Sequence, residues 1–246
     1  MTEQEFYDKV GKTNGWDFSS IQCLSEGIGW DFYEEVVKRA SVSDILLDIG
    51  TGGGEKVLDI ASSFSLVIGI DNSKEMVQTA RANLVKSSAQ NVRFFQQPAE
   101  DLQFPNGFFD IASSRHCSFD SSQVAKVLKK GGWFLTQQVS EGDKSNLKQA
   151  FGRGQCFGEQ DGTLKENCIK ELQTAGFSKV EAYDYNSDEY FRTPEDLIFL
   201  LTHTPIIPDF GEQEGDLESL NAFIENNRTE KGIRTNSKRF LVIAKR

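Results

Sequence analysis

The stretch LLDIGTGGGEKVLDIA, residues 46–61, decides the fold of this chain. An apolar run ends at Asp48, a glycine-dense loop follows it, and a helical pattern begins at Glu55. A strand, a glycine loop and a helix in this order are typical of proteins that hold a nucleotide-like cofactor against the backbone. The residues in and around the loop therefore decide which cofactor is expected.

The alternation of strand and helix continues along the chain. Seven segments have the apolar pattern of buried strands, at residues 44–50, 66–71, 92–96, 108–114, 133–139, 179–185 and 239–245. Helical patterns lie between them, at residues 55–62, 73–87, 122–131 and 167–177. Ser73 is expected to cap the second of these helices, and Gly131 and Gly176 to end the last two. This order predicts an α/β fold with a doubly wound parallel sheet and helices on both faces.

Three segments interrupt the alternation within what we expect to be one domain, 1–246. Residues 1–40 are predicted to form a helical N-terminal lid, with Tyr7, Trp16 and Trp30 as its candidate aromatic contacts or as plain packing residues. Residues 41–138 hold the cofactor-binding core. Long excursions in a compact domain are often lids or binding elements, so 140–163 and 186–238 are expected to form cap segments around a substrate.

Composition disfavours several classes of protein. Acidic residues outnumber basic ones by 37 to 27, which gives a net charge of −10 and disfavours nucleic acid or an anionic membrane as partner. No apolar run approaches the roughly 20 residues that a membrane-spanning helix needs. The N-terminus lacks the pattern of a secretory signal, and the four cysteines lack zinc spacing, so we expect a cytoplasmic protein without a structural metal.

Two common phosphate-binding patterns fail at the glycine loop. A P-loop requires Gly-Lys-Ser/Thr at the start of the helix, whereas this chain has Gly54 followed by Glu55. In the dinucleotide pattern G-x-G-x-x-G, counted from Gly50, the third glycine falls on Glu55. A carboxylate there would compete with a pyrophosphate for the helix N-terminus. The pattern that remains is D-x-G-x-G-x-G.

This pattern resembles the nucleotide-binding signature of the class I S-adenosylmethionine-dependent methyltransferases, and the resemblance extends over residues 36–138. It implies a Rossmann-like, seven-stranded, mostly parallel sheet whose last strand is antiparallel, and S-adenosyl-L-methionine as cofactor. The physical fit is good, because this cofactor carries no phosphate and glycines allow it to lie against the backbone. Asp48 can bind its ammonium group, directly or through water.

Further matches lie at the ends of the next two strands. Asp71 ends the second strand, 23 residues after Asp48, where a carboxylate can accept hydrogen bonds from ribose hydroxyls. The family's adenine-binding acid falls on Pro98, so the adenine amino group needs another partner, either Glu100 or water. The backbone N–H of Ala99 remains available to the ring. Leu102 and Phe104 could line the adenine or simply pack in the core.

The residues that we expect to bind the cofactor belong to the loop and to the neighbouring strand ends: Asp48, Gly50, Thr51, Gly52, Gly54, Asp71, Asn72, Ala99, Glu100 and Ser114.

Candidate catalytic residues should follow the fourth and fifth strands, where ligands bind in open α/β sheets. Methyl transfer needs alignment and water exclusion, and it needs a base only where the nucleophile loses a proton. His116 is a candidate base or substrate anchor, with helix capping or packing as the alternative. Arg115 could bind an acidic substrate or pair with a surface acid. His203 could reach the site from the 186–238 cap segment or have a structural role. One of Gln137 and Gln138 could face the site.

The leading interpretation is a methyltransferase with a small or medium-sized acceptor. An RNA methyltransferase and a non-catalytic protein that binds S-adenosylmethionine remain as alternatives. A nicotinamide-dependent oxidoreductase is disfavoured because G-x-G-x-x-G fails.

Overall fold

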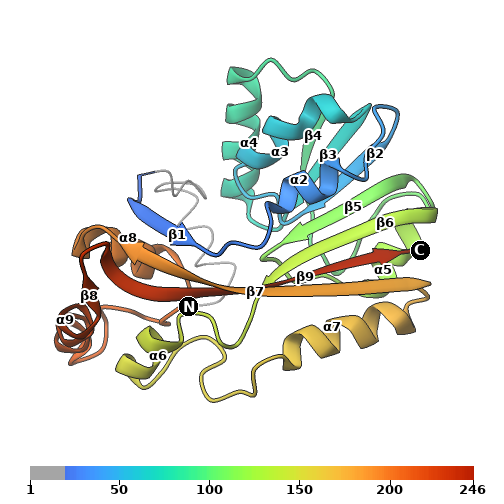
Figure 1. The fold of residues 1–246 in the computed structure, drawn as a ribbon. Helices are drawn as coiled ribbons and strands as arrows, with labels where there is room; N and C mark the ends of the chain where they lie inside the picture. Colours follow the sequence, from blue (N-terminus) through green and yellow to red (C-terminus); the bar gives the residue numbers. More distant parts are fainter. Residues whose placement is uncertain (1–19) are drawn as a thin grey trace.

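A computed structural model describes residues 20–246, in which one mixed sheet organises the chain (Figure 1). Five neighbouring strands are parallel: β4 (Val92–Gln96), β3 (Leu66–Asp71), β2 (Ile45–Ile49), β5 (Phe109–Arg115) and β6 (Leu128–Val139). The strand β9 (Gly232–Lys245) follows β6 and is antiparallel both to it and to β7 (Lys179–Phe191). This is the predicted Rossmann-like α/β architecture with an antiparallel last strand.

The strand count differs from the prediction of seven. Two short strands bring the described sheet to nine: β1 (Cys23–Glu26) pairs with β7, and β8 (Arg228–Thr229) pairs with β9. Both are too short to show an alternating pattern in the sequence. They extend the sheet without changing its class.

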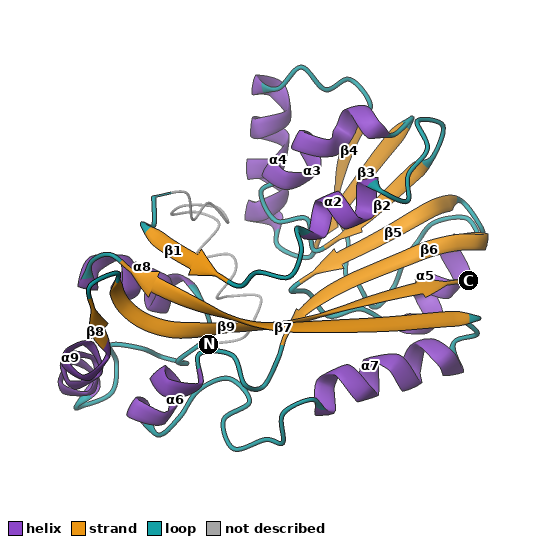
Figure 2. Ribbon diagram, viewed as in Figure 1, coloured by secondary structure: helices purple, strands orange, loops and turns teal. Residues whose placement is uncertain are grey.

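Helices cover both faces of the sheet (Figure 2). One face carries α2 (Phe32–Val37), α3 (Glu55–Ile60) with the short 3-10 helix η1 (Ala61–Ser63), and α4 (Lys74–Lys86). The other face carries α5 (Ser121–Val127) and α7 (Thr163–Thr174). Each set buries apolar side chains against the sheet, so the strands contribute to two hydrophobic clusters.

The predicted helix ends are right in two cases and wrong in one. Ser73 caps α4 through its side chain, which accepts a hydrogen bond from the Met76 N–H, and Gly176 follows α7 with a positive φ of 91°. The helix expected to end at Gly131 instead ends at Val127. Leu128 already pairs with Phe109 of β5, so strand pairing ends the helix a turn early.

The last two long strands extend well beyond the predicted ones. They pair from Lys179 opposite Lys245 to Phe191 opposite Ile233, and so include residues that we had assigned to the 186–238 segment. Their buried positions there include Ser187, Thr235 and Ser237. Because these buried positions hold small polar residues, the sequence lacks the apolar–polar alternation that would predict a strand there.

A second cluster of elements surrounds the extended half of this ribbon (Figure 1). It consists of α6 (Ser145–Phe151), α8 (Pro194–His203) and α9 (Asp216–Asn227), which share a third hydrophobic cluster with the strands. Thus the 140–163 and 186–238 segments pack as a lobe with its own core. Their role as a substrate cap stays a prediction.

The described part of the N-terminal region is only partly helical, and its role as a lid stays a prediction. Residues 20–40 contain the strand β1 and the helix α2, whose N-cap is Asp31. Tyr7 and Trp16 lie outside the described residues. In the part of the chain that the structure describes, no helix is long and apolar enough to cross a membrane.

Candidate functional site

The glycine loop turns sharply between β2 and α3. Gly50, Gly52 and Gly54 have φ values of 72°, 55° and 76°, which glycine adopts most easily. A Cβ on Gly50 would lie 2.4 Å from the Cβ of Cys117, so space as well as conformation requires glycine there. The N–H groups of Gly50 and Thr51 both donate to the carbonyl of Ile70, at 2.9 Å, and this holds the loop against β3.

Asp48 stands buried directly before this loop. Its side chain is 1% exposed, and its Oδ1 accepts a 2.5 Å hydrogen bond from Ser113 Oγ. Its Oδ2 is buried and has no hydrogen-bond partner among the described residues. Burial raises the pKa of this carboxyl to about 6, and the hydroxyls of Ser113 and Thr51 oppose that shift. A cationic group of a ligand would satisfy this oxygen.

Asp71 joins the loop to the end of β3. Its Oδ2 accepts from the Gly52 N–H and its Oδ1 from the Ser73 N–H, each at 2.9 Å. These bonds orient the carboxylate at the carboxyl edge of the sheet. Each oxygen has a further lone pair, so ribose hydroxyls could still donate to it. Asn72 is exposed beside it.

The segment expected to contact adenine lies at the surface next to the turn after β5. Pro98 and Glu100 are exposed and Ala99 is buried, and Ser118 Oγ lies 3.4 Å from Glu100 Oε1. Leu102 is fully buried in the core. Phe104 packs edge-to-face on Phe109, with ring centroids 5.1 Å apart. Core packing therefore accounts for both apolar residues.

Arg115 ends β5 beneath the aromatic ring of Tyr33, from α2. Its guanidinium carbon lies 6.0 Å from the ring centroid, its Nε is buried without a partner, and it forms no ion pair with a described carboxylate. The predicted pairing with a surface acid is thus absent from the described residues. Burial, followed by the charge of Asp48, raises the pKa of Tyr33 well above its ordinary value. Arg115 and Asp48 therefore offer opposite, incompletely satisfied charges in one buried region.

His116 follows in a left-handed backbone conformation, with φ 56°. Its N–H donates to the Gln137 carbonyl at 2.8 Å, and its Nε2 lies 3.0 Å from Gln137 Nε2. Gln137 Oε1 in turn accepts a 2.7 Å hydrogen bond from the indole N–H of Trp30. Burial, with the nearby charges of Arg239, Arg115 and Lys144, lowers the pKa of His116 well below its usual range. This shift favours the neutral form of the imidazole.

The glycine loop, Asp48 and Asp71 thus lie together in the arrangement that the sequence predicts for an adenosine cofactor without phosphates, and a family model matches this part of the chain. The model described as "Methyltransferase domain" matches residues 40–185. The chain belongs to the class I S-adenosylmethionine-dependent methyltransferases.

Two curated relatives share part of this methyltransferase core. The uncharacterized methyltransferase YcgJ of Bacillus subtilis is 39% identical over 97 residues, which cover 37% of this chain and 38% of that protein. A demethylmenaquinone methyltransferase of Lactococcus lactis is 29% identical over 116 residues, 43% of this chain and 46% of its own length. The matches therefore span less than half of either relative.

Solved structures show the same methyltransferase fold. The crystal structure of YcgJ has a TM-score of 0.63 with 19% identity and covers 87% of this chain and 97% of its own. A Haemonchus contortus phosphoethanolamine N-methyltransferase in complex with S-adenosyl-L-methionine has a TM-score of 0.56 with 21% identity, over 98% of this chain and 56% of its own. At such identities the likeness concerns the fold.

The structure does not bring His203 to the glycine loop of the methyltransferase. It lies in the last turn of α8, where its ring stacks on Phe199 with centroids 4.1 Å apart. Its Nδ1 lies 2.8 Å from the Phe199 carbonyl oxygen and 2.9 Å from Thr202 Oγ1. These contacts within one helix favour the structural role.

One side chain that contacts Asp48 was missed from the sequence, and the cofactor role expected of Ser114 stays a prediction. Ser113 bonds Asp48, because the two residues lie opposite each other in the pairing of β2 with β5. Ser114 Oγ donates instead to the Cys117 carbonyl at 3.0 Å, and Gln138 Nε2 donates to the same oxygen at 2.8 Å. The parallel register supplies this distinction, and the sequence alone does not contain it.

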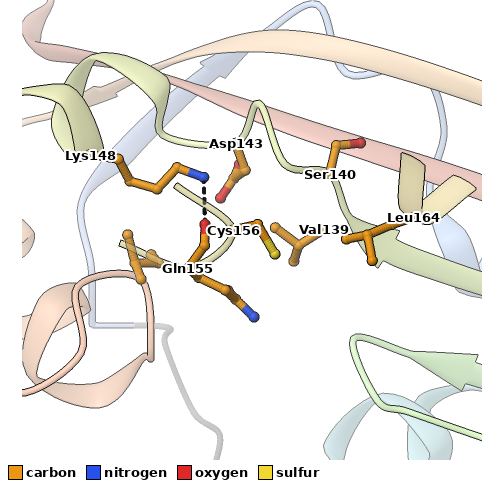
Figure 3. Close-up of a pocket in the computed structure, with 8 residues that line it drawn as sticks. Val139, Ser140, Asp143, Lys148, Gln155, Cys156 and Leu164 are labelled. Carbon is orange, nitrogen blue, oxygen red and sulfur yellow. Dashed lines mark hydrogen bonds between the residues drawn. The ribbon is translucent and has the colours of Figure 1, made fainter. Parts of the chain in front are cut away.

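A small cavity lies beyond the carboxyl end of β6 (Figure 3). It measures about 280 Å³ including its opening to solvent, and it is lined by Val139, Ser140, Asp143, Lys148, Gln155, Cys156, Leu164 and Ile206. Lys148 Nζ donates to the carbonyls of Glu141 and Gln155 at 2.6 and 2.9 Å. The amine thus fastens the 140–163 segment together. Cys156 lines the cavity, and burial raises the pKa of its thiol.

A buried ionic network connects the 140–163 segment to the ribbon. Asp143 pairs with Arg239, and Lys144 Nζ lies 2.7 Å from Glu189 Oε2. Burial raises the pKa of the Asp143 carboxyl, but the charges of Lys144 and Arg239 outweigh this effect and bring the pKa below its ordinary value. No group of three or more metal-ligating side chains occurs within residues 20–246.

Proposed function

We propose that this protein transfers the methyl group of S-adenosyl-L-methionine to a small-molecule acceptor. The observation that carries the proposal is the unpartnered Oδ2 of Asp48, buried at the start of a loop whose glycines leave the backbone open. A buried carboxylate oxygen without a donor is costly, and a bound ammonium group removes that cost.

Different residues of the chain would bind different parts of the cofactor. Asp48 would hold the ammonium group, and the unpaired guanidinium of Arg115 would hold the carboxylate of the same amino-acid moiety. Asp71 would accept the ribose hydroxyls. The Ala99 N–H would meet the adenine ring, with Glu100 or water at its amino group.

When bound, the cofactor supplies a methyl group activated by its sulfonium. The protein's part is to align the acceptor with that group and to exclude water. Tyr33 and Trp30 lie over this region from the N-terminal side: Tyr33 packs on Arg115, and Trp30 contacts Gln137 and the ring of Tyr185. These aromatic side chains would shield the reacting atoms from solvent.

A small acceptor is favoured over RNA by the charges. The chain is acidic overall. Two of the cations near His116, Arg239 and Lys144, are already paired with Asp143 and Glu189, and the third, Arg115, would bind the carboxylate of the cofactor. Paired and buried cations offer little to a phosphate backbone. The name of the L. lactis relative, a demethylmenaquinone methyltransferase, supports a small-molecule acceptor as well.

The test is formation of S-adenosylhomocysteine from S-adenosyl-L-methionine in a metabolite extract separated by size. We expect product only with the small-molecule fraction, and at low cofactor concentration much less product from the Asp48→Asn variant. Product only with the RNA-containing fraction would support the RNA alternative. Cofactor binding without turnover in any fraction would support a non-catalytic protein.

A further inference from the structure

We propose that Trp30 and Gln137 hold His116 as the tautomer with its proton on Nδ1, so that it presents a fixed N–H donor to an oxygen atom of the methyl acceptor and does not act as the general base. The role toward the acceptor rests on the proposed methyl transfer. The tautomer itself rests on three hydrogen-bonding groups alone.

The first step is the orientation of the Gln137 amide. An indole N–H only donates, so the oxygen of the amide must face Trp30, 2.7 Å from its Nε1. The amide NH₂ therefore faces His116. This assignment follows from the chemistry of tryptophan and needs no observed hydrogen atoms.

The second step is the position of the imidazole proton. The amide NH₂ of Gln137 can only donate, so His116 Nε2, 3.0 Å away, must accept and carries no proton. The neutral ring then has its proton on Nδ1. This nitrogen makes no hydrogen bond with any residue in the described part of the chain, so it is the ring nitrogen left for a ligand.

The third step is the charge state. A protonated ring would turn an Nε2–H toward the Gln137 amide donors. The charged groups that act on the ring are Arg115 of β5, Arg239 of β9 and Lys144 before α6. Asp143 and Glu189 pair with the last two of these, and Arg115 has no such partner. Geometry and charge therefore both favour the neutral form.

The fourth step is rigidity and place. The turn that carries His116 is fastened to β6, because His116 N–H donates to the Gln137 carbonyl and Gln138 donates to the Cys117 carbonyl. Cys117 lies against Gly50 of the cofactor loop. A donor fixed here suits an acceptor with a carbonyl or ionised oxygen near the methylated atom. A nucleophile that must lose its proton needs a different base.

The tautomer can be measured directly, because the chain contains only two histidines. Nitrogen-15 spectra of histidine-labelled protein, assigned with His203→Gln, report which ring nitrogen carries the proton. We expect His116 to show a protonated Nδ1 and a bare Nε2, unchanged between about pH 5 and 8, where an ordinary histidine titrates. A protonated Nε2, or titration in that range, would overturn the proposal.

Variants of Gln137 and Trp30 test the cause. Gln137→Glu replaces the donor with an acceptor, so the proton should move to Nε2 and the pKa of His116 should rise. Trp30→Phe frees the amide to rotate, and should give a mixture of tautomers. If the protonation of the two His116 ring nitrogens stays as in the wild type in either variant, the hydrogen bonds from Trp30 through Gln137 do not fix the tautomer.

Two substitutions separate a donor from a base. Asparagine places an amide N–H close to the position of Nδ1 and tolerates the positive φ, whereas glutamine places its amide nearer Nε2. We expect His116→Asn to retain most turnover and His116→Gln to lose at least tenfold, with S-adenosylhomocysteine binding kept in both. Equal loss in both variants would overturn the donor role, while absence of binding in the wild type would count against the proposed function instead.

Discussion

Ser113 and Asp48 lie opposite each other on neighbouring parallel strands, and the serine hydroxyl donates a 2.5 Å hydrogen bond to one oxygen of the buried carboxylate. The bond orients the side chain and leaves the other oxygen without a partner among the described residues. In the proposed cofactor site, this oxygen would therefore be oriented to accept a hydrogen bond from a ligand.

Asp48→Asn keeps the shape of this side chain and removes its charge. We expect its affinity for S-adenosylhomocysteine to fall about 10- to 100-fold, in keeping with the 1.5–3 kcal/mol of a hydrogen bond to a charged group. Calorimetric titration measures this. Ser113→Ala is the matched control, and it should lower the affinity for S-adenosylhomocysteine less than Asp48→Asn does, because the charge of Asp48 remains. Equal affinity of Asp48→Asn and wild type would exclude an ionic role for Asp48.

The same substitution should affect stability in a pH-dependent way. Burial raises the folded-state pKa of Asp48 from 3.8 to about 6, so the native protein binds this proton more tightly than the unfolded chain. Stability from this group is therefore present at low pH and falls as pH rises from about 4 to about 6. Over that interval, the free energy of unfolding of ligand-free Asp48→Asn should rise relative to that of the wild type, by up to about 3 kcal/mol.

Denaturant unfolding of both proteins at several pH values measures this difference. Other carboxyls, such as Asp143 and Asp216, have lowered pKa values and change stability in the opposite direction, so only the difference between the two proteins is informative. A difference that does not vary between pH 4 and pH 7 would show that Asp48 is not desolvated in solution.

Arg115 should recognise the amino-acid end of the cofactor. We expect Arg115→Met to weaken binding of S-adenosylhomocysteine at least tenfold and to leave 5′-methylthioadenosine, which lacks that end, unaffected. The affinity of Arg115→Lys for S-adenosylhomocysteine should lie between those of the wild type and Arg115→Met, because lysine keeps the charge without the fork geometry. Equal weakening of both ligands would indicate general damage to the site.

Gly50→Ala tests the close approach of the loop to the turn after β5. The new Cβ would lie 2.4 Å from the Cβ of Cys117, in addition to the strain of a positive φ. Gly131→Ala is the control, since its φ is 81° but its Cβ would meet nothing within 4 Å. We expect Gly131→Ala to cost about 1–2 kcal/mol of stability, and Gly50→Ala to cost more and to abolish cofactor binding. Similar losses for both would mean that the crowding at Cys117 relaxes freely.

The sequence was most informative where local chemistry decides the structure. Loop glycines that need positive φ and an acid at the end of a strand can be recognised from spacing, as Gly50 and Asp71 show. The sheet class followed from the alternation of apolar strands with helices. The end of α5 was wrong, because pairing of Leu128 with β5 outweighed a local glycine signal.

What the sequence did not contain is the register and the long-range contact. The hydrogen bond of Ser113 to Asp48 follows from the position of Ser113 opposite Asp48, which only the register shows. The contacts of Trp30 with Gln137, and of Tyr33 with Arg115, join residues about 80–110 positions apart. Small polar residues inside the extended ribbon made strand positions look like a loop.

Direct titration of the wild-type protein with S-adenosylhomocysteine tests the central claim, that the loop from Asp48 to Gly54 holds an adenosine cofactor without phosphates. The account predicts micromolar binding that is strongly weakened in the folded Asp71→Ala variant, and no comparable binding of a nicotinamide dinucleotide. Absence of S-adenosylhomocysteine binding to folded wild-type protein, or tighter binding of the dinucleotide, would contradict it.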